Sequence, residues 1–281
     1  MKTSTAASRI YTFIGMTELH VHLPALHEGQ QEIRRNPARY KVLACGRRWG
    51  KTRLGSLLCL AHGLAGQRAW WVAPSYKMAA VGWRGISKLA EQVTGATIKQ
   101  VDRIVTLPSG GWVQVRSADD PQSLRGEGLD FVVLDECAFM REEAWSEVLR
   151  PSLSDRKGGA MFISTPKGHN WFWNLWRRGQ DGQEPEWQSW KRPTAENPYI
   201  DKDEIEAARH GLPERIFAQE YLADFMDDAG GVFRRVMAAA TATEQPPKPG
   251  GQYLFGVDWG KQNDFTVISV LDMATKSMDH G

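Results

Sequence analysis

The stretch KVLACGRRWGKT, residues 41–52, runs from apolar residues into a loop with two glycines and ends in Gly-Lys-Thr. A phosphate-binding P-loop needs glycines so that its backbone N–H groups can converge on one anion. It also needs a lysine for the terminal phosphates and a hydroxyl for Mg²⁺. The general pattern G-x-x-x-x-G-K-[ST] requires glycine where this chain has Cys45, with Gly46 one position later. The stretch alone therefore supports two interpretations, a nucleotide-binding loop and an ordinary turn between a strand and a helix.

Strand and helix patterns alternate on both sides of this loop. Apolar runs that predict buried strands occupy residues 41–45, 69–74, 131–134 and 160–165. Periodic segments that predict helices occupy residues 52–65, 76–93 and 142–153, and residues 104–117 predict a hairpin around Pro-Ser-Gly-Gly. This alternation predicts an α/β fold, a mostly parallel sheet with helices on both faces.

Changes in composition and residue pattern divide the chain into five segments. Residues 1–26 are expected to be irregular, and a P-loop domain is expected over residues 27–185, beginning with a short helix before Pro37. A small helical subdomain is expected over 186–240, where a polar, turn-rich stretch precedes two amphipathic helices broken at Gly211 and Pro213. Residues 241–251 form a Pro-rich linker, and residues 252–281 contain two further strand patterns, YLFGVD and FTVISVLD.

Bulk composition excludes several classes of protein. The 281-residue chain has 42% hydrophobic and 24% charged residues, which is ordinary globular composition. Its three cysteines form neither a C-x-x-C pair nor an even framework, which predicts a reducing compartment, reduced and buried thiols and no metal cluster. The N-terminus has no signal-peptide core, which predicts a cytoplasmic location. No run of about 18 apolar residues occurs, so no membrane is expected as a partner. The net charge of +2 decides nothing about DNA, because local basic patches suffice for DNA binding.

Two adjacent acids end the third apolar run, in the stretch FVVLDECA. In open α/β sheets ligands bind at the carboxyl ends of strands, so Asp135 is expected to hold Mg²⁺ there. Glu136 is expected to orient and deprotonate an attacking water. The alternative is that both acids begin a loop and face solvent. The P-loop pattern, about 85 residues earlier, favours the metal-binding interpretation.

Five ordered motifs resemble a known family. GRRWGKT, SLRGEGLDFVVLDECA, ISTPKGHNWFWNLW, ENPYI and QEYLADF occur in this order in the large terminase subunit of tailed bacteriophages, the ATPase that drives genome packaging. The resemblance covers residues 27–281. It implies a P-loop ATPase domain of the ASCE or RecA-like type, a helical lid, and the opening hairpin of an RNase H-like nuclease. P-loops of this family often carry a small residue and an arginine where the general pattern differs, which accommodates Cys45 and Arg47.

The resemblance also implies roles for particular residues, with ATP and Mg²⁺ as cofactors. Gln30 would sit by the adenine ring, Arg47 would sense the terminal phosphate, and Ser164 and Thr165 would couple hydrolysis to movement. Arg125 would reach into a neighbouring subunit's site as an arginine finger. The nucleotide-binding set is Gln30, Gly46, Arg47, Arg48, Trp49, Gly50, Lys51 and Thr52; the catalytic set is Glu136, Arg125 and Lys51; the ATPase Mg²⁺ ligands are Thr52 and Asp135.

Several of these residues have plain alternatives. Gln30 is equally interpreted as a solvated polar residue near a helix start, and Ser164 with Thr165 as the cap of a strand end before Pro166. Arg125 has the alternative of an ordinary surface ion pair. The aromatic cluster WFWNLW is expected to pack in the core rather than to stack on bases.

An arginine finger implies a homo-oligomeric ring, with an isolated chain being monomeric and slow to hydrolyse ATP. The resemblance implies double-stranded DNA, the portal protein and the small terminase subunit as partners, in the cytoplasm of a bacterial host. Asp258 matches the first metal-binding carboxylate of the family's nuclease, which uses two divalent metals. The further acids lie on later strands, and the chain stops at Gly281, so no nuclease activity is expected from it.

Two other functions compete with the packaging ATPase. Another P-loop enzyme, a helicase-like ATPase or a small-molecule kinase, would need a second motor lobe or an acceptor pocket, and neither is identified. An inert prophage remnant, truncated inside a β domain, would expose strand edges that invite aggregation.

Overall fold

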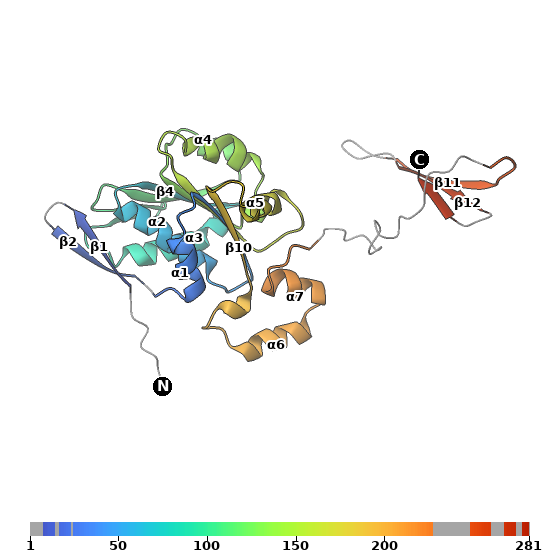
Figure 1. Cartoon of the computed structure of the whole chain (residues 1–281). Coiled ribbons are helices and arrows are strands. Elements are labelled where there is room, and N and C mark those ends of the chain that lie inside the picture. Colours follow the sequence, from blue (N-terminus) through green and yellow to red (C-terminus); the bar gives the residue numbers. More distant parts are fainter. Residues whose placement is uncertain are drawn as a thin grey trace. The chain divides into compact units, whose positions relative to one another are not determined.

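The computed structural model describes residues 8–14, 17–23, 25–226, 248–259, 267–273 and 277–280. The chain forms two units, Met1–Asp228 and Ala229–Gly281 (Figure 1). No helix in the described ranges is both long enough and apolar enough to cross a bilayer.

An eight-stranded sheet forms the centre of the first unit, in the order β10-β3-β9-β8-β4-β7-β6-β5. Neighbouring strands from β10 to β7 are parallel, and only β6 and β5 add antiparallel pairs at one edge. The strands are β3 (Tyr40–Cys45), β4 (Arg68–Ala73), β5 (Thr97–Lys99), β6 (Ile104–Thr106), β7 (Trp112–Ser117), β8 (Phe131–Asp135), β9 (Gly159–Ser164) and β10 (Trp187–Arg192). The predicted mostly parallel α/β sheet is confirmed, as is the hairpin between β6 and β7.

Helices cover both faces of this sheet and enclose two hydrophobic cores. In β4, Trp71 belongs to one core while its neighbours Trp70 and Val72 belong to the other, because successive side chains point to opposite faces. Helices α1 (Glu28–Arg35), α2 (Lys51–Leu64) and α3 (Tyr76–Ala90) border the first core. The π-helical turn η3 (Ala144–Leu149), α4 (Arg150–Ser152) and α5 (Trp171–Gln180) lie on the second side. Burial on both faces explains why the strands read as nearly continuous apolar runs.

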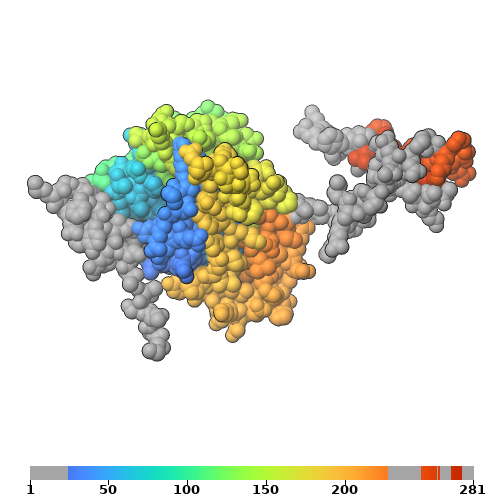
Figure 2. Space-filling model, viewed as in Figure 1, coloured from blue at the N-terminus to red at the C-terminus, as the bar shows by residue number. Residues whose placement is uncertain are grey.

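Two amphipathic helices follow the sheet, as the sequence predicts. They are α6 (Lys202–Gly211) and α7 (Glu214–Tyr221), and Figure 2 shows their orange segment adjoining the yellow segment of β10. The side chain of Asp201 caps α6 by accepting a hydrogen bond from the Asp203 N–H, at 3.0 Å. Three short 3-10 turns complete the unit: η1 (Pro121–Leu124), η2 (Cys137–Phe139) and η4 (Thr194–Glu196).

Two sequence-based expectations about the first unit are wrong. Residues 1–26 are not irregular throughout, because β1 (Ser8–Ile14) pairs antiparallel with β2 (Thr17–Leu23). The alternating pattern ELHVHL is the signal that could have predicted β2. The polar stretch from residue 186 is not only turns either. It contains β10, which pairs parallel with β3, so the main sheet extends past the expected boundary at 185.

The second unit is a three-stranded antiparallel sheet in the order β11-β12-β13. The two predicted strands are confirmed as β11 (Tyr253–Asp258) and β12 (Val267–Asp272), and β13 (Ser277–His280) adds a third. Of the expected linker 241–251, residues 241–247 lie outside the described residues, as does the side chain of Asp258. The RNase H-like assignment, the metal-binding role of Asp258 and the other domain boundaries stay predictions.

Candidate nucleotide-binding site

The predicted P-loop joins β3 to α2 at the carboxyl edge of the sheet. Arg48 and Gly50 have positive φ angles of 63° and 106°, while α2 begins at Lys51. Left-handed residues within a tight turn bring successive N–H groups to one concave side, which is the geometry of an anion-binding nest. The two left-handed residues thus give the loop a tight turn directly before α2.

The displaced glycine of the loop has a structural reason. A Cβ atom at Gly46 would lie 2.5 Å from the carbonyl oxygen of Tyr221, and closer still to Thr194 Oγ1. Cys45, at the position of the general pattern's glycine, is fully buried at the end of β3. Glycine is thus needed one position later, where the chain beyond β10 approaches the loop.

Three predicted site residues meet beside this loop. Lys51 Nζ lies 3.4 Å from Glu136 Oε1, and Ser164 Oγ donates to Glu136 Oε2 at 3.2 Å. The strand order explains the meeting, since β9, which ends at Ser164, lies between β3 and β8. Glu136 itself has a left-handed backbone, with φ 49° and ψ 42°, at the bend that follows β8. The alternative that Glu136 simply faces solvent does not fit these contacts.

Asp135 is a buried acid with an unpaired oxygen. Its side chain is 4% exposed, and Oδ1 has no hydrogen-bond partner among the described residues. Burial, and then the charge of Glu136, raise the pKa of Asp135 to about 7, against a smaller lowering by Lys51. A buried carboxylate of this kind fits a cation, and Thr52, in the first turn of α2, adds a hydroxyl. The residues present therefore fit Mg²⁺, although the described chain holds no cluster of three His, Cys, Asp or Glu side chains.

Arg47 contacts the helical segment after β10. Its side chain pairs with the Glu220 carboxylate on α7, and its backbone N–H donates to the Glu220 carbonyl oxygen at 2.6 Å. The hydrogen bond that Arg47 donates to Glu220 raises the pKa of the Arg47 guanidinium. In this structure the expected phosphate sensor is held by α7, and Arg48 beside it is exposed.

Gln30 and Trp49 are both buried against the loop rather than open to a ligand. Gln30 Nε2 donates to the Gly50 carbonyl oxygen at 2.9 Å, and its Oε1 accepts from the His27 N–H at 3.1 Å. The Trp49 ring packs edge-on against His27, with ring centroids 4.7 Å apart, and donates to Glu196 Oε2 at 3.1 Å. Only the backbone of Trp49 is therefore available to a nucleotide, and Gln30 is not the solvated residue of the alternative interpretation.

Arg125 and Thr165 are the remaining predicted residues of this unit. Arg125 follows η1, and its Nε donates to Gln122 Oε1 at 2.5 Å. Within the described ranges it makes no ion pair and no hydrogen bond to the P-loop, so the surface ion pair of the alternative interpretation is not observed. Thr165 is buried directly after β9. The structure does not bring Arg125 to the site of its own chain.

Sequence reasoning missed several side chains that contact the loop. They are His27, Thr194, Glu196, Asn197 and Glu220. The last four lie in or beside the motifs ENPYI and QEYLADF, which were quoted for the resemblance without a role. Their position in or beside these motifs was the one sequence feature that could have indicated a role at the loop.

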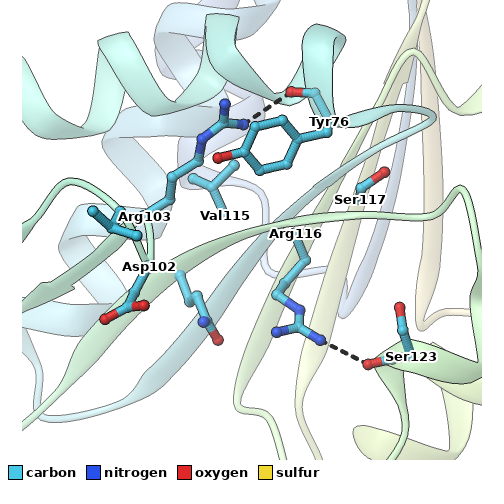
Figure 3. Close-up of a pocket in the computed structure, with 9 residues that line it drawn as sticks. Tyr76, Asp102, Arg103, Val115, Arg116, Ser117 and Ser123 are labelled. Atoms are coloured by element: carbon cyan, nitrogen blue, oxygen red, sulfur yellow. Dashed lines mark hydrogen bonds between the residues drawn. The ribbon is translucent and has the colours of Figure 1, made fainter.

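A separate hollow of about 230 Å³ lies over β7 and the start of α3 (Figure 3). Two arginines on its wall are held by carbonyl oxygens: Arg103 Nη1 donates to Tyr76 at 2.9 Å, and Arg116 Nη2 donates to Ser123 at 2.7 Å. None of the predicted nucleotide-binding residues lines it. The candidate site is thus defined by the loop and its neighbours, and not by this hollow.

A glycine-containing nest between a parallel strand and a helix, with paired acids two strands away, defines a P-loop NTPase fold. Residues 42–239 match the family model described as terminase large subunit, T4likevirus-type, N-terminal. The chain belongs to the terminase large-subunit family.

Individual relatives agree with this assignment. The large terminase subunit of Thermus virus P23-45 is 29% identical over 98% of this chain and 64% of its own length. The solved ATPase domain of the Thermus phage P74-26 large terminase is 29% identical with a TM-score of 0.63, over 72% of this chain and 94% of that domain. A large terminase from a thermophilic bacteriophage, solved in complex with ADP, shares the fold at 16% identity and a TM-score of 0.58, over 89% of this chain and 66% of that one. The chain therefore spans 64% of the length of the Thermus virus P23-45 subunit, and nearly all of the length of the solved P74-26 ATPase domain.

Proposed function

We propose that this chain hydrolyses ATP to drive double-stranded DNA into a viral procapsid. The observation that carries the proposal is the meeting of Lys51, Glu136 and Ser164 beside a loop with nest geometry. Membership of the terminase large-subunit family supports DNA packaging as the purpose, and the likeness to a solved terminase ATPase domain supports ATP as the substrate.

Lys51 and Glu136 carry the central step of this proposal. The Lys51 ammonium faces the Glu136 carboxylate at 3.4 Å. A terminal phosphate competes for the same ammonium group, because its charge is larger and the nest holds it nearby. Glu136 then becomes free to accept a proton from a water that attacks the phosphorus atom. Binding of ATP would thus release Glu136 from Lys51, so that Glu136 can act as the general base.

Thr52 and Asp135 would hold Mg²⁺, which neutralises charge on the phosphates when bound. Burial disfavours the charged form of Asp135, and a cation would reverse that preference. The Ser164 hydroxyl donates to Glu136, so a movement of that carboxylate would shift the end of β9. Such a shift would give Ser164 and Thr165 a coupling role. Each of these roles belongs to a residue at the carboxyl edge of the sheet.

The proposal includes partners beyond this chain. Arg125 would complete a neighbouring site in a ring, with the portal protein, the small terminase subunit and duplex DNA as further partners. The exposed position of Arg125, directly after η1, supports a role outside its own site.

Steady-state ATP turnover tests this function most directly. Turnover is measured against protein concentration, with and without duplex DNA, for the original chain and for Glu136→Gln. Glu147→Gln is the matched control, because Glu147 is an exposed acid on η3. Turnover that rises with concentration, disappears in Glu136→Gln and persists in Glu147→Gln supports the proposal. Absence of both turnover and nucleotide binding would indicate an inert remnant instead.

A further inference from the structure

Four consecutive carbonyl groups of the P-loop each accept a hydrogen bond from a side chain outside the loop. Thr194 Oγ1 donates to the Arg47 oxygen at 2.8 Å, and Asn197 Nδ2 donates to the Arg48 oxygen at 2.6 Å. His27 Nε2 lies 3.0 Å from the Trp49 oxygen, and Gln30 Nε2 donates to the Gly50 oxygen at 2.9 Å. We call these four side chains, His27, Gln30, Thr194 and Asn197, the carbonyl clamp.

The clamp bears on phosphate binding because a peptide group is planar and trans. Its carbonyl oxygen and its N–H group point in opposite directions, so fixing one fixes the other. Holding the oxygens of residues 47–50 away from the loop interior turns the N–H groups of residues 48–51 toward it. Among the described residues the N–H groups of Arg48, Gly50 and Lys51 have no hydrogen-bond partner, whereas the Trp49 N–H makes a long 3.4 Å contact with the Gly46 oxygen.

The fold delivers the clamp from both sides of the loop. His27 and Gln30 lie at the start of α1, before β3 in the chain. Thr194 and Asn197 follow β10, the parallel neighbour of β3, and the Gly46 N–H donates to the Arg192 oxygen at 2.9 Å where that strand ends. A parallel strand beside β3 necessarily ends at the same edge as the loop, which places η4 against it.

We infer that the carbonyl clamp preorganises the P-loop, and that Thr194 and Asn197 are positioning residues for the phosphates of the nucleotide. The inference rests on the proposed function, and it gives Gln30 a role through the loop backbone rather than through adenine. Without the clamp, the peptide groups of the loop would become ordered only when the phosphate binds. That ordering cost would be subtracted from the binding free energy.

Thr194→Val and Thr194→Ser form the matched pair that tests this inference. Valine keeps the shape of threonine but loses the donor to the Arg47 oxygen, whereas serine keeps the donor. We expect Thr194→Val to raise the Kd for ADP about fivefold to tenfold, since one hydrogen bond is at stake, and Thr194→Ser to restore most of the affinity. Thr106→Val, at an exposed site on β6, controls for the substitution itself.

Inorganic triphosphate, as a second probe, separates the clamp from contacts to the base. A clamp acts on the phosphate nest, so Thr194→Val, Asn197→Ala and Gln30→Ala should each weaken ADP and triphosphate by the same factor. Weakening of ADP alone in Gln30→Ala would assign Gln30 to adenine and remove it from the clamp. Unchanged Kd values in both Thr194→Val and Asn197→Ala, with folded proteins by thermal unfolding, would overturn the inference.

Lys51→Ala distinguishes failure of the inference from failure of the proposed function. If Lys51→Ala loses nucleotide binding while Thr194→Val and Asn197→Ala bind like the original chain, the function stands and the clamp does not. If the original chain binds neither ADP nor triphosphate, both are wrong. A lowered melting temperature without any change in Kd would make Thr194 merely structural, and would likewise overturn the inference for that residue.

Discussion

Strands β3 and β11 are both mostly apolar runs of six residues, YKVLAC and YLFGVD, but their surroundings differ. Five of the six residues of β3 are buried. In β11, by contrast, Leu254, Phe255 and Val257 are 58%, 63% and 45% exposed. An apolar run therefore predicts a strand in both places, but it says nothing about the layer that covers the strand. Chemistry accompanies the covered strand, because contacts as precise as those of Glu136 require a packed core behind them.

The largest effect, on ATP turnover, is expected at Arg125, which would complete the nucleotide site of a second chain. Arg125→Ala should lower ATP turnover about 1,000-fold at high protein concentration, since an arginine finger stabilises transition-state charge. Nucleotide affinity should change little, because Arg125 has no hydrogen bond to its own P-loop in the described structure.

Mixing two inactive variants checks the same point. Glu136→Gln keeps the finger and lacks the base, whereas Arg125→Ala keeps the base and lacks the finger. Recovery of turnover in the mixture would place Arg125 in a neighbour's site, whereas a mixture as inactive as its components would argue that Arg125 has no role in trans.

The next largest effect, on stability, distinguishes Gly46, which follows β3, from Gly256 in β11. Gly46→Ala places a Cβ atom within 2.5 Å of Thr194 and of the Tyr221 backbone, whereas a Cβ atom at Gly256 in β11 meets nothing within 4 Å. We expect Gly46→Ala to lower the free energy of unfolding by about 1–3 kcal/mol and to weaken ADP binding. Gly256→Ala should do neither. Urea unfolding of the two variants measures the difference, and equal stabilities would contradict the close approach at Gly46.

Asp135 offers a pH-dependent effect at the covered edge. Its pKa is raised by burial to about 7 in the folded state, above the usual value near 4. The folded state therefore binds more protons between these values, so this acid's contribution to stability falls as pH rises from about 4 to 7. Asp135→Asn, measured without Mg²⁺, should gain stability relative to the original chain over that range. A stability difference independent of pH would show that the pKa is not raised.

The smallest effect is expected on the uncovered strand. Phe255→Ser should change the free energy of unfolding of the main unit by less than about 0.5 kcal/mol, because the side chain is 63% exposed. Intrinsic tryptophan fluorescence during urea unfolding follows that unit, which contains the buried Trp49, Trp70 and Trp71. A large shift would show that the described strands of the second unit support the main sheet.

The parts of the fold and site that the sequence predicts are those set by local pattern. Strand β8 followed by Asp135 and Glu136 is one continuous signal, and so is the passage from β3 through the P-loop into α2. Strand β10 was not predicted because EWQSWKR contains too many polar residues to read as an apolar run. The strand tolerates them because it lies at the edge of the sheet and pairs with β3 alone. The need for glycine at position 46 was equally invisible, since it depends on a backbone group at Tyr221. The roles of Thr194 and Asn197 depend on contacts that no spacing rule reports.

The carbonyl clamp also has a consequence for synthesis of the chain. Arg47 and its partner Thr194 are separated by 147 residues, and seven strands of the main sheet, β4 to β10, lie between them in sequence. When the P-loop leaves the ribosome, half of its clamp has not yet been translated. The Arg47 and Arg48 carbonyls can therefore accept their hydrogen bonds from Thr194 and Asn197 only after β10 has joined the sheet, so the clamp is completed late in translation.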